Sequence, residues 1–156
     1  MTEHTDAESI RNWIDDDLVE NVDQISDDAA EFNFTVKISN LLIHVIRREP
    51  NGPVLIGQQI EYGESIQASI NQLSDTQRNK LIARIRETLT AVPVIYGFHD
   101  EHDNNVRFGD MHRIFLEHRI YPGEMSQHAL MNGLIAVWKT MRYLDDITTL
   151  IDSVDE

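Results

Sequence analysis

The amino-acid sequence predicts an α+β fold, in which helices pack on an antiparallel five-stranded sheet. The clearest observation is at residues 31–38, where apolar and polar side chains alternate as they do in a half-buried strand. Two more strand-like runs follow through short links rich in turn-forming residues, which predicts an antiparallel meander. Apolar residues at spacings of three and four predict helices over residues 6–22, 74–92 and 124–152.

The first predicted helix begins near Asp6 and runs to residue 22. Asp6 or Ser9 is placed to cap its start. Its apolar face is expected to hold Ile10, Trp13, Ile14, Leu18 and Val22. We expect the three aspartates at 15–17 on its solvated face, a polar turn at residues 23–30 and a frayed tail at residues 1–5.

Three strands are expected next, over residues 31–38, 41–48 and 54–62. Ser39 and Asn40 predict a tight turn between the first two, and the sequence EPNGP at 49–53 predicts a turn before the third. The first strand is expected to bury Phe32, Phe34, Val36 and Ile38. The third is expected to bury Val54, Ile56, Ile60 and Tyr62.

Residues 64–121 are expected to form a short helical turn, one helix and two strands. Residues 64–73 suggest a short helical turn, and Ser74 with Gln77 forms a capping-box sequence that opens a helix. The apolar face of this helix comprises Leu81, Ile82, Ile85, Leu89 and Val92. A fourth strand over residues 93–99, a turn over 100–105 and a fifth strand over 106–121 follow, with a bulge expected at Gly109 and Asp110.

The last predicted helix runs from residue 124 to residue 152 and completes the order α-βββ-α-ββ-α in a single domain, residues 1–156. Its apolar stripe comprises Leu130, Leu134, Val137, Met141, Leu144 and Ile151. At 1.5 Å per residue such a helix spans roughly 40 Å, more than the width of a five-stranded sheet of this size. Part of the stripe, near Trp138 and Tyr143, is therefore expected to overhang the sheet. It is covered within the monomer, by a second copy or by a partner, and the sequence leaves these alternatives open.

Composition narrows the functional classes. The 156 residues include no cysteine, which excludes disulfides, thiolate metal sites and thiol nucleophiles. The opening MTEHTDAES has no basic start or apolar stretch, and no run approaches the length of a membrane helix. We therefore expect a cytoplasmic protein without a membrane partner.

The net charge is −14, from 27 acidic and 13 basic residues, of which only Lys37, Lys80 and Lys139 are lysines. Such a charge repels phosphate backbones and disfavours nucleic-acid binding. Few lysines and many aspartates favour a halophilic archaeon as the source, because concentrated salt screens like charges. An ordinary acidic protein remains the alternative.

A resemblance is carried by Ile10-x-x-Trp13 in the first helix, Phe32-Asn33-Phe34 in the first strand, and the segment from Arg119-Ile120-Tyr121 to Leu134. In these features and in element order, the chain resembles type III secretion chaperones and YbjN-like proteins. It looks more like a family of uncharacterised archaeal proteins with the same layout. Members of this wider fold bind partner polypeptides and commonly dimerise, so the resemblance implies protein binding and carries no catalytic residues.

Two groups of side chains are candidates for metal binding. The first is the run His99, Asp100, Glu101, His102 and Asp103. Imidazole and carboxylate groups suit divalent ions, but successive side chains diverge at a turn, which favours a solvated acidic turn. The second group is His44, His112 and His118, which converge only if the second and fifth strands are neighbours. Hydrogen-bonded histidines at the core edge are the favoured interpretation.

Other catalytic patterns are absent from the sequence. There is no G-x-S-x-G elbow and no glycine-rich phosphate loop, and the adjacent carboxylates at 15–17 and at Asp145 and Asp146 point apart around a helix. Six arginines form either a local basic patch or dispersed ion pairs, and pairing is favoured; they are Arg47, Arg48, Arg84, Arg86, Arg113 and Arg119.

We therefore predict no catalytic, cofactor-binding or metal-binding residues. The predicted function is a non-enzymatic protein-binding module, chaperone- or adaptor-like, that acts as a homodimer and binds a further protein. The alternative is a metal-binding enzyme or sensor that uses the strand and turn histidines.

Overall fold

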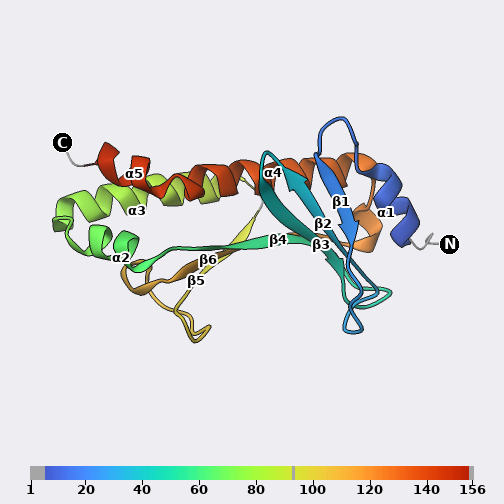
Figure 1. Cartoon of the computed structure of the whole chain (residues 1–156), viewed down its shortest axis with the longest axis horizontal. Helices are drawn as coiled ribbons and strands as arrows, with labels where there is room; N and C mark the ends of the chain where they lie inside the picture. Colours follow the sequence, from blue (N-terminus) through green and yellow to red (C-terminus); the bar gives the residue numbers. More distant parts are fainter. Residues whose placement is uncertain (1–5, 93, 155–156) are drawn as a thin grey trace. The chain divides into compact units, whose positions relative to one another are not determined.

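The computed structural model describes residues 6–92 and 94–154 (Figure 1). The α+β class is confirmed, but the sheet has six strands, in the order β1-β2-β3-β4-β6-β5, where five were predicted. Over the described residues the element order is α-ββββ-αα-ββ-αα, with two short 3₁₀ turns. The chain divides into two compact units, and each is described by itself: Met1–Gln58 with Glu117–Trp138, and Gln59–Leu116 with Lys139–Glu156.

The first helix of the first unit is shorter than predicted. α1 spans Ala7–Trp13, and the Asp6 side chain caps it by accepting a hydrogen bond from the Ser9 N–H at 2.9 Å. The prediction of a helix to residue 22 is wrong because the Asp15 carboxylate accepts the Asp17 N–H at 2.9 Å. Such a local turn competes with helix continuation. The predicted frayed tail at residues 1–5 lies outside the described residues.

The strand that the prediction missed is β1, Asn21–Gln24, at one edge of the sheet. It pairs antiparallel with β2, and Val22 lies opposite Val36. Val22 was therefore wrongly placed on a helix face. The β1 segment has too few apolar residues to show the alternation typical of a strand, so only its pairing with β2 identifies it as a strand.

The predicted meander is confirmed. It consists of β2 (Phe32–Ile38), β3 (Leu41–Arg47) and β4 (Val54–Glu61). Ser39 and Asn40 have φ angles of 47° and 68°, the left-handed conformation that a tight two-residue hairpin turn requires. The predicted inward faces are buried, and the alternate residues of β3 and β4 are more exposed.

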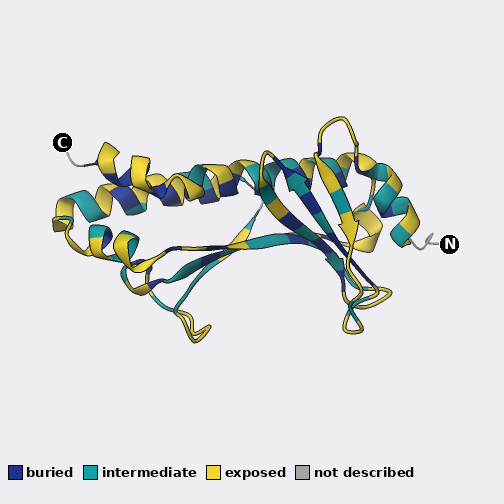
Figure 2. Cartoon of the chain, in the orientation of Figure 1, coloured by how far each residue is buried: buried dark blue, intermediate teal, exposed yellow. Residues whose placement is uncertain are grey.

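The last helix is broken. Pro122–Glu124 forms a 3₁₀ turn (η2), α4 spans Gln127–Asp145, and α5 spans Ile147–Ser153. The chain turns at Asp146, whose carboxylate accepts the Thr149 hydroxyl at 2.7 Å. The predicted continuous helix is therefore wrong. All the predicted stripe residues are buried within one chain: Leu130, Leu134, Val137, Met141, Leu144 and Ile151. Figure 2 shows the buried and exposed residues alternating along α4.

α4 approaches the sheet of the first unit at Gly133. A Cβ atom placed there would lie 2.6 Å from His118 Cδ2 and 2.7 Å from Ile56 Cδ1. Both distances are well below the optimal carbon–carbon separation of about 3.5–4.0 Å. Glycine at this position therefore permits the close approach of helix to sheet.

The second unit contains α2 (Glu64–Asn71), α3 (Asp75–Thr90), β5 (Ile95–His99) and α5. The predicted capping box is confirmed, since Ser74 Oγ accepts the Gln77 N–H at 3.1 Å and Gln77 Oε1 accepts the Ser74 N–H at 2.9 Å. The buried Tyr62 hydroxyl donates to the Leu144 carbonyl at 2.6 Å and ties the start of this unit to the end of α4.

The fifth predicted strand starts too early. Phe108–Asp110 is a 3₁₀ turn (η1) rather than a bulge, and β6 spans Arg113–Ile120. Pro93, the predicted start of the preceding strand, lies outside the described residues. No helix in the described part of the chain is long and apolar enough to cross a membrane.

Candidate functional site

The strand histidines do not converge. His44 pairs with Gly57 in the register that also places Val45 opposite Ile56. Ile56 and His118 both approach Gly133 of α4, so His118 lies on the helix-covered face. His44, one residue from Val45, lies on the opposite face. His112 belongs to the other unit.

Within the run from His99 to Asp103, residues 101–103 lie in an exposed turn, whereas His99 ends β5 and is half-buried, as is Asp100. The Asp100 carboxylate accepts backbone N–H groups of Asn104 at 3.0 Å and of His102 at 2.8 Å. These hydrogen bonds, that of Asn104 first, hold the pKa of Asp100 below its usual value. Among residues 6–92 and 94–154, no group of three His, Cys, Asp or Glu side chains is arranged to hold a metal ion.

The six arginines are divided between the two units, three in each. Arg47 is 1% exposed and stacks over Phe32 at 5.6 Å, whereas its neighbour Arg48 is exposed. Arg113 pairs with Asp103 at 2.9 Å. Ion pairing, the favoured interpretation, is therefore found for Arg113 and also for Arg119, which pairs with Glu117 at 2.6 Å.

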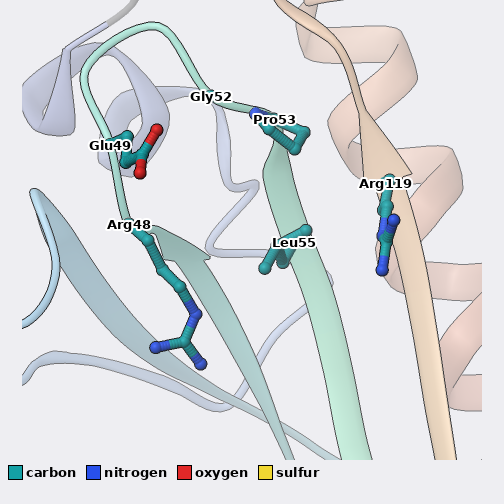
Figure 3. Close-up of a pocket in the computed structure, with 6 residues that line it drawn as sticks. All are labelled: Arg48, Glu49, Gly52, Pro53, Leu55 and Arg119. Atoms are coloured by element: carbon teal, nitrogen blue, oxygen red, sulfur yellow. The ribbon is translucent and has the colours of Figure 1, made fainter.

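A first surface pocket lies in the first unit, at the turn between β3 and β4. It has a volume of about 240 Å³, and we call it the arginine pocket. It is lined by Arg48, Glu49, Gly52, Pro53, Leu55 and Arg119 (Figure 3). Arg119 Nε donates a hydrogen bond to Glu117 Oε2 at 2.6 Å. This bond fixes one of the two guanidinium groups in the pocket.

A second pocket, in the second unit, is lined mainly by apolar side chains. It has a volume of about 170 Å³, and we call it the aromatic groove. It is lined by Ile82, Ile85, Arg86, Leu89, Tyr96, Phe98 and Phe108. The rings of Tyr96 and Phe98 lie 5.8 Å apart, and Phe108 meets Phe98 edge-on at 5.7 Å. This geometry is typical of stable aromatic contacts and makes a firm apolar wall.

The aromatic groove lies beside an edge of the sheet, because β5 is the last strand in the sheet order. The Phe98 carbonyl accepts the Val106 N–H at 2.9 Å, and the His99 carbonyl accepts the His112 N–H at 2.8 Å. Since alternate residues of a strand direct their backbone groups to opposite sides, Tyr96 directs its N–H and C=O to the side of Val106, away from β6. Ile95 and Tyr96 are 47% and 40% exposed.

Sequence reasoning found neither surface as a site. The pattern Tyr96-Gly97-Phe98 in a predicted strand was an available signal for an aromatic face. The sequence does not say, however, that this strand ends the sheet or that Phe108 folds against it. Arg119 and Leu55 are 64 positions apart by number, and only strand pairing brings them to one pocket.

The fold defines an α+β protein of helices on an antiparallel sheet. The chain belongs to the family described as "Uncharacterized conserved protein (DUF2299)", whose model matches residues 6–148. In fold it is similar to the crystal structure of an uncharacterized protein from Methanothermobacter thermautotrophicus. The two sequences are 20% identical, the match covers 94% of this chain and 96% of that chain, and the TM-score is 0.70. A comparison with curated proteins finds no match.

These findings support the predicted likeness to an uncharacterised archaeal family. They do not show the predicted likeness to type III secretion chaperones or YbjN-like proteins.

Proposed function

We propose that the chain is a non-enzymatic protein-binding module, chaperone- or adaptor-like, that binds an extended polypeptide segment along β5. The observation that supports this proposal best is the aromatic groove beside the outer edge of a terminal strand. Proteins usually protect edge strands with charge, proline or a cover. Here the edge instead carries the exposed apolar side chains of Ile95 and Tyr96.

Strand addition fits this geometry. A segment placed along β5 pairs with the outward N–H and C=O of Tyr96, and its alternate side chains lie on one face. One large apolar side chain of the segment fills the aromatic groove, whose volume of about 170 Å³ suits a single anchor. Arg86 supplies the only charge among the described residues that line the groove, so a carboxylate beside the anchor finds a partner there.

The homodimer stays part of the proposal, but its support changes. The buried stripe of the last helix no longer calls for a second copy. Two β5 strands pairing antiparallel give a symmetric dimer that covers both edges. A partner segment then competes with the second copy for the same edge. The net charge of −14 opposes dimer formation at low salt and is screened at high salt.

The proposal is tested by selecting binders from a displayed library of random peptides. We expect the selected peptides to share one large apolar residue next to an acidic residue. Tyr96→Asp should weaken their binding at least roughly tenfold, because it places a charge in the apolar wall. Leu42→Asp, which places the same charge on an exposed apolar side chain in the other unit, is the matched control and should leave binding unchanged.

Light scattering on the same proteins tests the dimer. The mass should double at high micromolar concentration in molar potassium chloride and return to the monomer value in Tyr96→Asp. A wild-type chain that stays monomeric and selects no peptide would refute the proposed function.

The alternative function, a metal-binding enzyme or sensor, rests on pairwise contacts beside the turn, since no three such side chains of the described residues are grouped to hold an ion. Glu101 places its carboxylate oxygens 3.5 Å from His102 Nε2 and 4.0 Å from His112 Nε2. Elemental analysis of protein purified without a histidine tag decides the question. Substoichiometric zinc, manganese and nickel would eliminate this alternative.

A further inference from the structure

Arg119 is held in position on the sheet. It lies two residues after Glu117 in β6, and residues two apart share one face of a strand. The Glu117 side chain is only 10% exposed, whereas that of Arg119 is 44% exposed. The hydrogen bond that Arg119 donates to Glu117, and then the negative charge of Glu117, raise the pKa of Arg119, and a hydrogen bond with Tyr121 adds to this effect. A guanidinium has five N–H donors, so these two contacts leave donors for a ligand.

Arg48 reaches the same pocket from the end of β3. Among the described residues, the Arg48 side chain has no hydrogen bond or ion pair, although the chain carries 27 acidic residues. Figure 3 shows Arg48 and Arg119 on either side of Leu55, with the Glu49 carboxylate nearer the turn. Leu55 and Pro53 therefore give the pocket an apolar floor between two cations.

Charge limits the ligand to one negative charge. The two arginines are balanced by Glu49 and Glu117, so the pocket offers directed donors rather than an excess of positive charge. A dianion such as phosphate would add two negative charges to a chain that already carries −14. A single carboxylate matches the fork of a guanidinium and adds only one.

Size limits the ligand to an end group. Pockets that enclose whole small molecules measure about 300–1,000 Å³. The arginine pocket, at about 240 Å³, is smaller and open to solvent. It has room for a carboxylate and a short branched apolar group.

We propose that the arginine pocket binds one carboxylate carried on a small apolar group. Arg48 and Arg119 pair with the carboxylate, and Leu55 and Pro53 contact the apolar group. Two sources share this chemistry, namely a free branched monocarboxylic acid and the C-terminus of a polypeptide that ends in such a side chain. The proposal concerns the first unit and does not depend on binding at β5.

Nuclear magnetic resonance titration tests the proposal on the full chain. The probes are 4-methylpentanoate, its neutral amide, and a tetrapeptide of three alanines and a C-terminal leucine with either a free or an amidated C-terminus. We expect the free carboxylates to shift the Leu55 amide and the Arg119 Nε–H resonances, and the two amides to leave them in place. Saturation by both carboxylates supports the shared chemistry, and saturation by the peptide alone identifies a polypeptide end as the source.

Variants distinguish carboxylate binding at the arginine pocket from non-specific binding elsewhere on the chain. Arg48→Gln should weaken carboxylate binding at least about tenfold. Lys80→Gln removes one exposed positive charge from α3, outside both the arginine pocket and the aromatic groove, and should leave binding unchanged. Arg119→Lys keeps the charge but loses the fork, so it should also weaken binding, and thermal unfolding checks that it stays folded. Equal shifts with carboxylate and amide, or equal affinity in Arg48→Gln and wild type, would overturn the proposal.

Discussion

Replacing Gly133 by alanine tests whether α4 contacts the sheet as closely as the structure shows. The new Cβ would lie 2.6 Å from His118 Cδ2 and 2.7 Å from Ile56 Cδ1, so both contacts are short by about 1 Å. Overpacking of this kind costs typically about 1–3 kcal/mol, and two simultaneous clashes place Gly133→Ala near the upper value. Alanine is favoured over glycine in a helix by about 1 kcal/mol. We therefore expect a net loss of about 2 kcal/mol in the free energy of unfolding.

Urea unfolding followed by circular dichroism, at a fixed salt concentration, measures this loss. For a chain of this length, about 2 kcal/mol lowers Tm by roughly 4–8 °C. Gly123→Ala is the matched control because nothing lies within 4 Å of a Cβ there. It should be neutral or stabilising, since alanine reduces the freedom of the unfolded chain.

A double-mutant cycle with Ile56→Val identifies the contact. Ile56→Val removes the Cδ1 atom that the new methyl group meets, and alone it costs about 0.5–1.5 kcal/mol. In the Gly133→Ala background it should cost less, because it also relieves the clash. A Gly133→Ala protein that melts higher than wild type would show that helix propensity alone decides, and would refute the close approach.

Three further predictions follow from single contacts and from charge. Tyr62→Phe leaves the buried Leu144 carbonyl without its hydrogen bond and should cost about 1–3 kcal/mol. Burial, and secondarily Asp145, raises the pKa of Tyr62. The free energy of unfolding of the wild type should therefore fall as pH rises above about 10, where the tyrosine ionises in the unfolded chain. Urea titrations at alkaline pH should show that the phenylalanine variant lacks this part of the fall. Ser74→Ala breaks the capping box and should cost about 1 kcal/mol by chemical unfolding, whereas Thr76→Ala in the same helical turn should not. Tm should rise from low to molar potassium chloride if the acidity is an adaptation to salt, and a fall would contradict that interpretation.

The central meander was predictable because its information is local. Alternation at residues 31–38 admits only one strand face, and Ser39-Asn40 supplies the left-handed turn that fixes the register with β3. The capping box at Ser74 is similarly local, since both hydrogen bonds join residues three apart. Where interactions between neighbouring residues determine the structure, the prediction from sequence agrees with it.

The sequence-based predictions were wrong where distant residues or competing local hydrogen bonds determine the structure. β1 exists because Asn21–Gln24 finds β2, and its own composition carries no strand signal. The break at Asp146 depends on a carboxylate that bonds Thr149, which outweighs the continuing apolar stripe. The aromatic groove depends on the strand order, which places β5 at an edge. The sequence around Tyr96 and Phe98 does not by itself predict which residues lie beside them in the fold.

The composition also bears on how either surface binds. In about 1 M salt the Debye length is roughly 3 Å, so long-range attraction between charged proteins is almost abolished. Binding then rests on apolar contact and on hydrogen bonds made at short range, which salt screens far less. The aromatic groove supplies the first, and the arginine pocket combines an apolar floor with two guanidinium groups. If the chain works in concentrated salt, affinity at the groove should therefore change little between low and molar salt. Affinity that fell steeply would instead mean that Arg86, rather than the aromatic wall, holds the segment.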